Sequence, residues 1–124
     1  MDERRRSTVV AAGGLGTFAV LQSALAAGAP IGRAAYGGRH EGRLPTGLRA
    51  TSAVAALGYA AGAVALLRDS KRPGVRRRVL TGLAFAMGAG TVANAVSPSP
   101  PERVWSPVCA VVAIASWRSR PTVR

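Results

Sequence analysis

Four long stretches without a charged residue constrain the fold of this chain more than any other feature. They lie between short clusters of charge and run from Ser7 to Gly32, Ala50 to Leu67, Val79 to Pro101 and Val104 to Trp117. A helix that crosses the hydrocarbon core of a membrane needs about 20 mostly apolar residues, with about 17 as the lower end. The first three stretches reach that range, and the fourth is short. We therefore predict an all-α, four-helix transmembrane bundle that forms a single domain over residues 1–124.

Local signals place the helix boundaries within these stretches. Pro30 cannot continue a helix that needs its N–H, and Thr46 is a plausible N-cap after Pro45. The fourth helix gains length from the stems of Glu102 and Arg103, which can snorkel toward the membrane surface. The predicted transmembrane helices are about 8–29, 46–67, 79–96 and 102–117.

Two other interpretations of the same stretches are open. The chain could have three spans, with the fourth stretch lying in the membrane interface. It could also be a soluble basic protein, because its formal net charge is +12. The first stretch also resembles a signal peptide with a cleavage site near Ala24–Ala26. Its apolar run is longer than the roughly 7–15 residues of such a signal, and Asp2 and Glu3 are unusual at its start. We expect it to be retained.

The distribution of basic residues predicts the orientation. Four spans place both termini and the Arg68–Arg78 turn on one side with twelve Lys and Arg residues, against five on the other side. Because basic residues favour the cytoplasm, we predict cytoplasmic termini and a multi-pass protein of the cell inner (plasma) membrane. The Arg68–Arg78 turn should attract anionic lipid headgroups, at about 1 kcal/mol per basic residue. We expect no nucleic-acid partner.

Small residues recur at spacings of three or four along the first three helices. Helices in a bilayer associate through close backbone approach at such positions. This pattern predicts a compact bundle, but it does not separate packing within one chain from a homodimer. The second helix carries Ala55, Gly58, Gly62 and Ala65, and the third carries Gly82, Ala86, Gly90 and Asn94.

The sequence contains no pattern typical of catalysis. None of the four stretches holds Asp, Glu, Lys, Arg or His, whereas proton-coupled transport usually requires an ionisable group inside the bilayer. No nucleophile arrangement, phosphate-binding loop or metal-ligand spacing occurs. We expect no enzyme activity, no cofactor and no metal. The single cysteine, Cys109, should be a buried small hydrophobic residue.

Polar residues within the helices gather toward one side of the predicted membrane. Gln22, Ser52 and Asn94 all lie near the outer ends of their helices. They form either a layer of interhelical hydrogen bonds, worth roughly 0.6 kcal/mol each, or the wall of a shallow outward-facing pocket.

Loop residues lie above this polar layer. His40, Arg49 and Glu102 complete the set of candidate ligand-binding or structural residues. Glu41 and Glu102 are the only acids on this side, so we expect them to pair with arginines at positions 43, 49 or 103. Such pairs would tie the first loop to the third.

Several loop-centred phrases resemble an uncharacterised family of small bacterial four-helix integral membrane proteins. They are "GAPIGRAAYGG" at 28–38, "RH" at 39–40, "LPTGLRATSAV" at 44–54 and "NAVSPSPPERVWSPV" at 94–108. The resemblance covers most of the chain and implies the same four-span fold. It implies no activity and no residue roles.

Three functions are compatible with these residues. The first is a small structural or accessory membrane protein. The second is a transporter component, or a protein that binds a small ligand or lipid through the outward-facing polar layer. The third and weakest is a membrane enzyme acting on lipid, with His40 and either Glu41 or Glu102 as acid and base.

Overall fold

The computed structural model describes residues 2–68 and 70–122, which are helical apart from short connections. Four main helices are α1 (Glu3–Ala27), α2 (Thr46–Leu67), α3 (Pro73–Ala95) and α5 (Trp105–Arg118). Shorter helices are η1 (Gly32–Ala34), η2 (Tyr36–Gly38) and α4 (Pro100–Arg103). The described part of the chain contains no strand, which confirms the prediction of an all-α fold.

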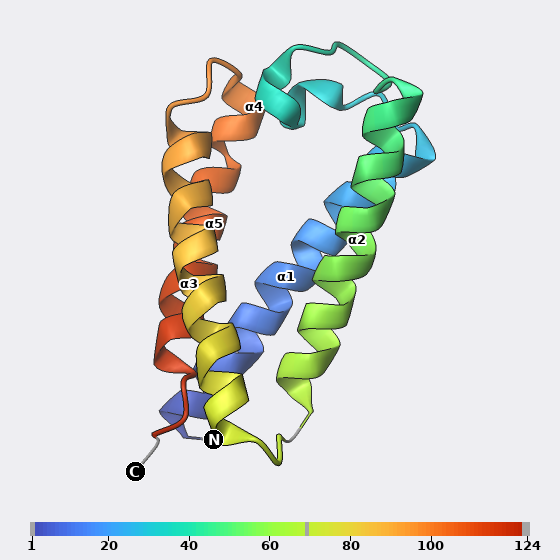
Figure 1. Cartoon of the computed structure of the whole chain (residues 1–124). Helices are drawn as coiled ribbons and strands as arrows, with labels where there is room; N and C mark the ends of the chain where they lie inside the picture. The colour runs from blue at the N-terminus through green and yellow to red at the C-terminus, as the bar shows by residue number, and fades with distance from the viewer. Residues whose placement is uncertain (1, 69, 123–124) are drawn as a thin grey trace.

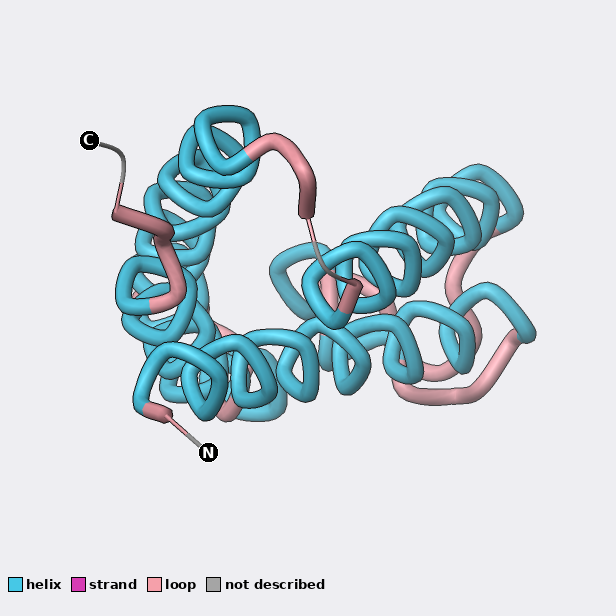
Figure 2. Tube along the Cα trace, turned by 90° about the horizontal axis from the view of Figure 1, so that it is seen from below, coloured by secondary structure: helices cyan, strands magenta, loops and turns pink. Residues whose placement is uncertain are grey.

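The helices form two hairpins, α1 with α2 and α3 with α5, which meet where α1 packs on α5 (Figures 1 and 2). The start of α1 and the described segment after α5 lie at the same end of the bundle as the end of α2 and the start of α3, and we call this the terminal end (Figure 1). The 28–45 and 96–104 connections lie together at the opposite end, which we call the loop end. The 28–45 and 96–104 connections therefore share one end of the bundle, as the four-helix prediction requires.

The boundaries of α2 match the prediction, but those of α1 do not. α1 begins at Glu3, because the carboxylate of Asp2 accepts a hydrogen bond of 2.8 Å from the backbone N–H of Arg5 and caps the helix. It ends where Gly28 adopts the left-handed conformation at φ 94°, before Pro30 is reached. Charge alone therefore gave a start that was too late.

The predicted start of the third helix at Val79 was also wrong. α3 begins at Pro73, which suits a first helical position because its missing N–H is not needed there. The early turns then place Arg76 against the end of α2, where its guanidinium donates to the carbonyl oxygens of Leu66 at 2.9 Å and Arg68 at 3.3 Å. These bonds tie the two hairpins together across the 68–72 turn.

The predicted fourth helix is divided in two. α5 begins at Trp105, and α4 precedes it by a single residue, Val104, which keeps right-handed helical dihedral angles of −60° and −27°. α5 has 14 residues, a length of about 21 Å, which alone falls short of the roughly 30 Å hydrocarbon core. With the stacked α4, the helical segment extends from Pro100 to Arg118.

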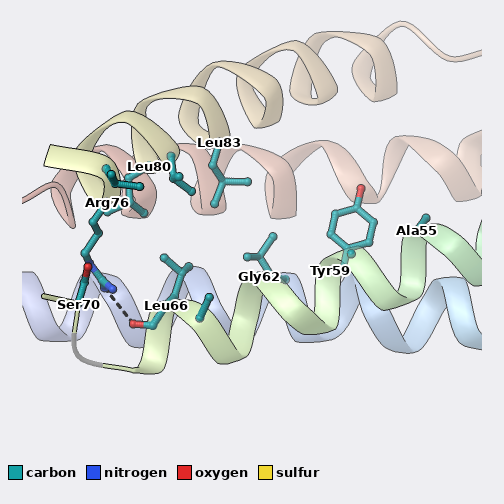
Figure 3. A pocket seen from close by; sticks show the side chains of 13 residues that line it. Ala55, Tyr59, Gly62, Leu66, Ser70, Arg76, Leu80 and Leu83 are labelled. Atoms are coloured by element: carbon teal, nitrogen blue, oxygen red, sulfur yellow. Dashed lines mark hydrogen bonds between the residues drawn. The ribbon is translucent and has the colours of Figure 1, made fainter. Parts of the chain in front are cut away.

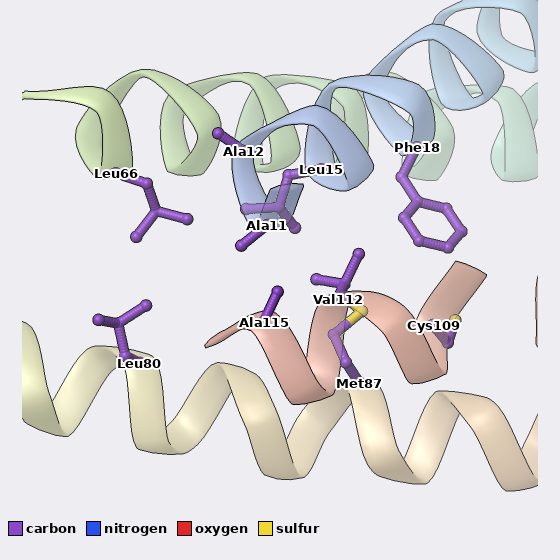
Figure 4. Packing of buried hydrophobic residues seen from close by; sticks show 10 residues of the cluster. All are labelled: Ala11, Ala12, Leu15, Phe18, Leu66, Leu80, Met87, Cys109, Val112 and Ala115. Carbon is purple, nitrogen blue, oxygen red and sulfur yellow. The ribbon is translucent and has the colours of Figure 1, made fainter. Parts of the chain in front are cut away.

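The main core draws on all four long helices (Figure 4). Ala11 and Leu15 of α1 face Val112 and Ala115 of α5, which are all nearly or fully buried. Cys109 is buried in the same cluster, as expected for a small hydrophobic residue.

The surface between the two ends is strongly apolar. Val20, Val54, Leu57 and Phe85 each expose about 70% of their surface, at 71%, 71%, 74% and 69%. Six serines are buried instead, at positions 7, 52, 97, 99, 116 and 119. In the described residues two helices, α1 and α2, are long and apolar enough to cross a membrane.

The C-terminal segment folds back onto α3 and α5. The guanidinium of Arg120 lies 3.1 Å from the ring centre of Trp117 and donates to Thr81, while Arg77 donates to the carbonyl of Pro121 at 2.9 Å. Desolvation against this surface, and then repulsion from Arg77, hold the pKa of Arg120 below its usual value. The terminal end is thus an ordered cap made of several chain segments.

Candidate functional site

A cavity of about 280 Å³ lies at the loop end, beneath the first loop. Side chains from both hairpins and from both connections at the loop end line it, so it forms only when the whole bundle assembles. Three of the six residues predicted from the sequence lie in its wall: Gln22 of α1, Asn94 of α3 and Glu102 of α4. The structure therefore brings half of the predicted polar layer together around one space.

Aromatic rings form much of the cavity wall. Phe18 is stacked on Tyr59, with ring centres 5.4 Å apart, and is tilted against Trp105 at the same distance. Tyr36 of η2 adds a fourth ring from above. The chain has only two each of Phe, Tyr and Trp, so most of its aromatic side chains gather here. Flat rings of this kind are typical of sites that hold an apolar or cationic molecule.

Gln22 lines the cavity and carries an unsatisfied polar group. Its Oε1 atom is buried and has no hydrogen-bond partner among the described residues. A buried acceptor left without a donor costs about 1–3 kcal/mol. The arrangement would therefore favour a small molecule that donates a hydrogen bond at this position.

Asn94 is anchored within α3 and bridges to α5. Its Nδ2 group donates to the carbonyl oxygen of Gly90 at 2.9 Å and contacts the sulfur of Cys109 at 3.5 Å. Gly90 permits this close approach, because a Cβ atom there would lie 3.3 Å from the same sulfur. The predicted small-residue face of the third helix is therefore directed toward α5 at this level.

Glu102 joins the third connection to the first loop. Its Oε2 atom accepts a hydrogen bond of 2.8 Å from the backbone N–H of Gly37, whose φ of 78° suits glycine. The next residue, Gly38, has a φ of 70°, and a Cβ there would overlap the side chain of Ser99. The Ser99 hydroxyl in turn donates to the carbonyl of Arg33. These contacts hold the first loop, which covers the cavity, against Ser99 and α4.

Ser52 supports the cavity without lining it. It is fully buried, and its hydroxyl lies 3.0 Å from that of Tyr36. Tyr36 has a positive φ of 52°, which is uncommon outside glycine. Ser52 thus fits the structural interpretation of the polar layer.

His40 and Arg49, by contrast, do not belong to the cavity wall. The Nε atom of Arg49 donates to the carbonyl of Ala26 at 3.1 Å and ties the start of α2 to the end of α1. His40 is half-buried, and its backbone carbonyl packs against Gly32. The structure therefore does not bring these two residues together with Gln22 and Asn94, because membrane depth alone does not show which side of a helix or loop a residue occupies.

The predicted ion pairs at the loop end were also wrong. Glu41 lies 3.8 Å from Arg33, and Glu102 binds a backbone N–H in place of an arginine. Arg103 donates to the carbonyl of Pro98 at 3.5 Å. The first and third connections are still tied together, but backbone groups and serine supply the contacts.

The sequence-based set of candidate site residues did not include the aromatic members of the site, Phe18, Tyr36, Tyr59 and Trp105. Their scarcity was the available signal, since each lies in a helix or loop that is otherwise made of small residues. For the described residues, no group of His, Cys, Asp and Glu is arranged to hold a metal ion.

Comparison with known proteins shows no match to a family model, to a curated protein or to a solved structure. The resemblance to a family of small four-helix membrane proteins therefore stays a prediction.

Proposed function

We propose that this chain is a small multi-pass membrane protein of structural or accessory type, with four spans and both termini in the cytoplasm. The apolar surface between two basic ends carries this proposal. Exposed Val, Leu and Phe side chains lie along the helices between the two ends, whereas six serines at the ends and within the helices are buried. Water-soluble helices show the opposite pattern, with an apolar face inward and charges outward.

The lengths of the helices support insertion. α1 and α2 extend for 25 and 22 residues, about 37 and 33 Å, which is enough to cross a core of about 30 Å. The terminal end then lies in the cytoplasm with most of the basic residues. The same basic cluster attracts anionic lipid headgroups and is not a nucleic-acid site.

Membrane fractionation tests this proposal. The full chain should stay in the membrane pellet through an alkaline carbonate wash and dissolve only in detergent. Release by the wash without detergent would contradict it.

A second function, binding of a small molecule from the outer face, is favoured by the cavity at the loop end. Its aromatic wall and the unsatisfied Oε1 of Gln22 suit an apolar molecule with one hydrogen-bond donor. No pair of acid and base groups meets there, so the site supports binding as an accessory or transporter component, not turnover.

Mass spectrometry of small molecules that co-purify with the protein tests this second function. A compound retained by the wild type should be lost from Gln22→Met and kept by Ser23→Met, since Ser23 is exposed on the same helix. Equal retention by both variants would contradict a site at Gln22.

A further inference from the structure

A second hollow lies between α2 and α3, on the side of the bundle where the two hairpins are not packed together. This open groove of about 500 Å³ extends along α2 from Ala55 to the turn at Ser70 (Figure 3). Leu66 from one wall and Leu80 and Leu83 from the other give it an apolar surface.

The small residues of α2 open this groove. Ala55, Gly58, Gly62 and Ala65 all line it, and a Cβ atom added at Gly58 would meet nothing within 4 Å. At Gly58 the face that was predicted to pack against another helix therefore borders open space within this chain, whereas at Gly62 it lies against Leu15 of α1.

A polar pocket of about 500 Å³ continues the groove at the terminal end. The two share Leu66, Ser70 and Arg76 as a common wall. The other walls of the pocket include Arg4 and Arg68, from separate parts of the chain. The pocket is also lined by Arg5, Thr8 and Asp2, whose carboxylate accepts from the backbone N–H of Arg5.

The dimensions of the joined site match one leaflet of a membrane. Ala55 and Leu66 are about 16 Å apart along a helix, which is about half of a 30 Å hydrocarbon core. The arginines then lie at the depth of the headgroups if the terminal end faces the cytoplasm. Arginine N–H groups suit phosphate oxygens in both charge and geometry.

We infer that this joined site binds one anionic phospholipid of the cytoplasmic leaflet, with an acyl chain in the α2–α3 groove and the phosphate in the arginine pocket. The inference rests on the proposed membrane topology. It differs from general attraction to the basic turn, because the arginines of the pocket come from α1, the turn and α3.

Native mass spectrometry of the full chain in mixed micelles tests the inference. The probes are phosphatidylglycerol and phosphatidylcholine with identical dioleoyl chains. The wild type should retain phosphatidylglycerol preferentially, and Arg4→Gln with Arg68→Gln should lower its affinity about tenfold or more, since each basic residue contributes about a factor of five. The matched control, Lys71→Gln with Arg78→Gln, removes the same charge from the basic turn outside the pocket, so it should lose only the general attraction to anionic lipid and lower the affinity less than the pocket pair does.

A second pair of variants tests the groove. Gly58→Leu fills it and should lower retention of both lipids about tenfold, whereas Gly82→Leu adds the same side chain at an exposed position of α3 with open space around it. Gly82→Leu should bind as the wild type does.

Three results would overturn the inference: equal retention of the two lipids by the wild type, equal losses in the pocket and control pairs, or a dimer that Gly58→Leu abolishes while lipid retention is unchanged. The last result would assign the groove to a second copy of the chain. Thiol labelling of a single-cysteine form in intact cells separates a failure of the lipid site from a failure of the topology.

Discussion

Gln22 is the residue whose structural and ligand-binding roles are most clearly separable. Its buried Oε1 lacks a partner, so the folded protein gains little from the polar group. We expect Gln22→Met, which keeps the shape of the side chain, to raise the free energy of unfolding by about 1 kcal/mol in the absence of ligand. Unfolding of the purified protein in detergent by denaturant measures this change.

The matched control for this variant is Ser23→Met, which adds the same side chain at an exposed position. A loss of stability in Gln22→Met that exceeds the control would show that Gln22 holds the bundle together, and the ligand proposal would lose its basis.

Gly38 is a second position where a single added Cβ atom should change the stability of the fold. Gly38→Ala should destabilise the fold by about 1–3 kcal/mol more than Gly42→Ala, because both glycines have a φ of 70° but only Gly38 lies against Ser99. Thermal unfolding in detergent compares the two. Equal losses would indicate that backbone strain alone matters and that the two outer loops are not held together at this contact.

At the scale of elements, the central feature is the crossing of α1 and α5. A Cβ atom at Gly14 would overlap the side chain of Val112, whereas one at Gly16 would meet nothing within 4 Å. We expect Gly14→Ala to lower the free energy of unfolding by about 1–3 kcal/mol and Gly16→Ala to raise it by up to about 1 kcal/mol. Denaturation of both variants in one detergent measures the difference, and a stabilised Gly14→Ala would contradict this crossing.

The elements themselves were largely predictable from the sequence. Charge-free stretches located all four main helices, and Pro45 marked the start of α2 at the predicted residue. The starts of α1 and α3 were missed because Asp2 and Pro73 are strong initiation signals that precede the apolar run. Charged residues can occupy the first turns of a helix, so the limits of an apolar stretch are not the limits of the helix.

The candidate site was only partly predictable, because it depends on how helices turn about their axes. Asn94 was predicted to lie on the small-residue face of the third helix, and that face does lie toward α5. Arg49 shared the same depth but is turned toward α1, where it bonds to Ala26. Sequence spacing gave the depth of these residues, whereas packing between hairpins decided which of them meet.

At the scale of the whole molecule, the division into two ends connects fold and function. The loop end carries the aromatic cavity, and the terminal end carries the arginine pocket. Tyr59 borders both the cavity and the α2–α3 groove, so a change in its position would alter the shape of both. The proposed outward-facing binding and the proposed lipid site both depend on which side of a membrane each end occupies.

The orientation of the chain is therefore the most direct test. Cys109→Ala removes the only cysteine, and single cysteines at the exposed positions Arg39→Cys and Lys71→Cys then report the loop end and the terminal end. In intact cells, a membrane-impermeant maleimide should label Arg39→Cys at once and Lys71→Cys only after permeabilisation. Labelling of both in intact cells, of neither, or of Lys71→Cys alone would contradict a four-span protein with cytoplasmic termini.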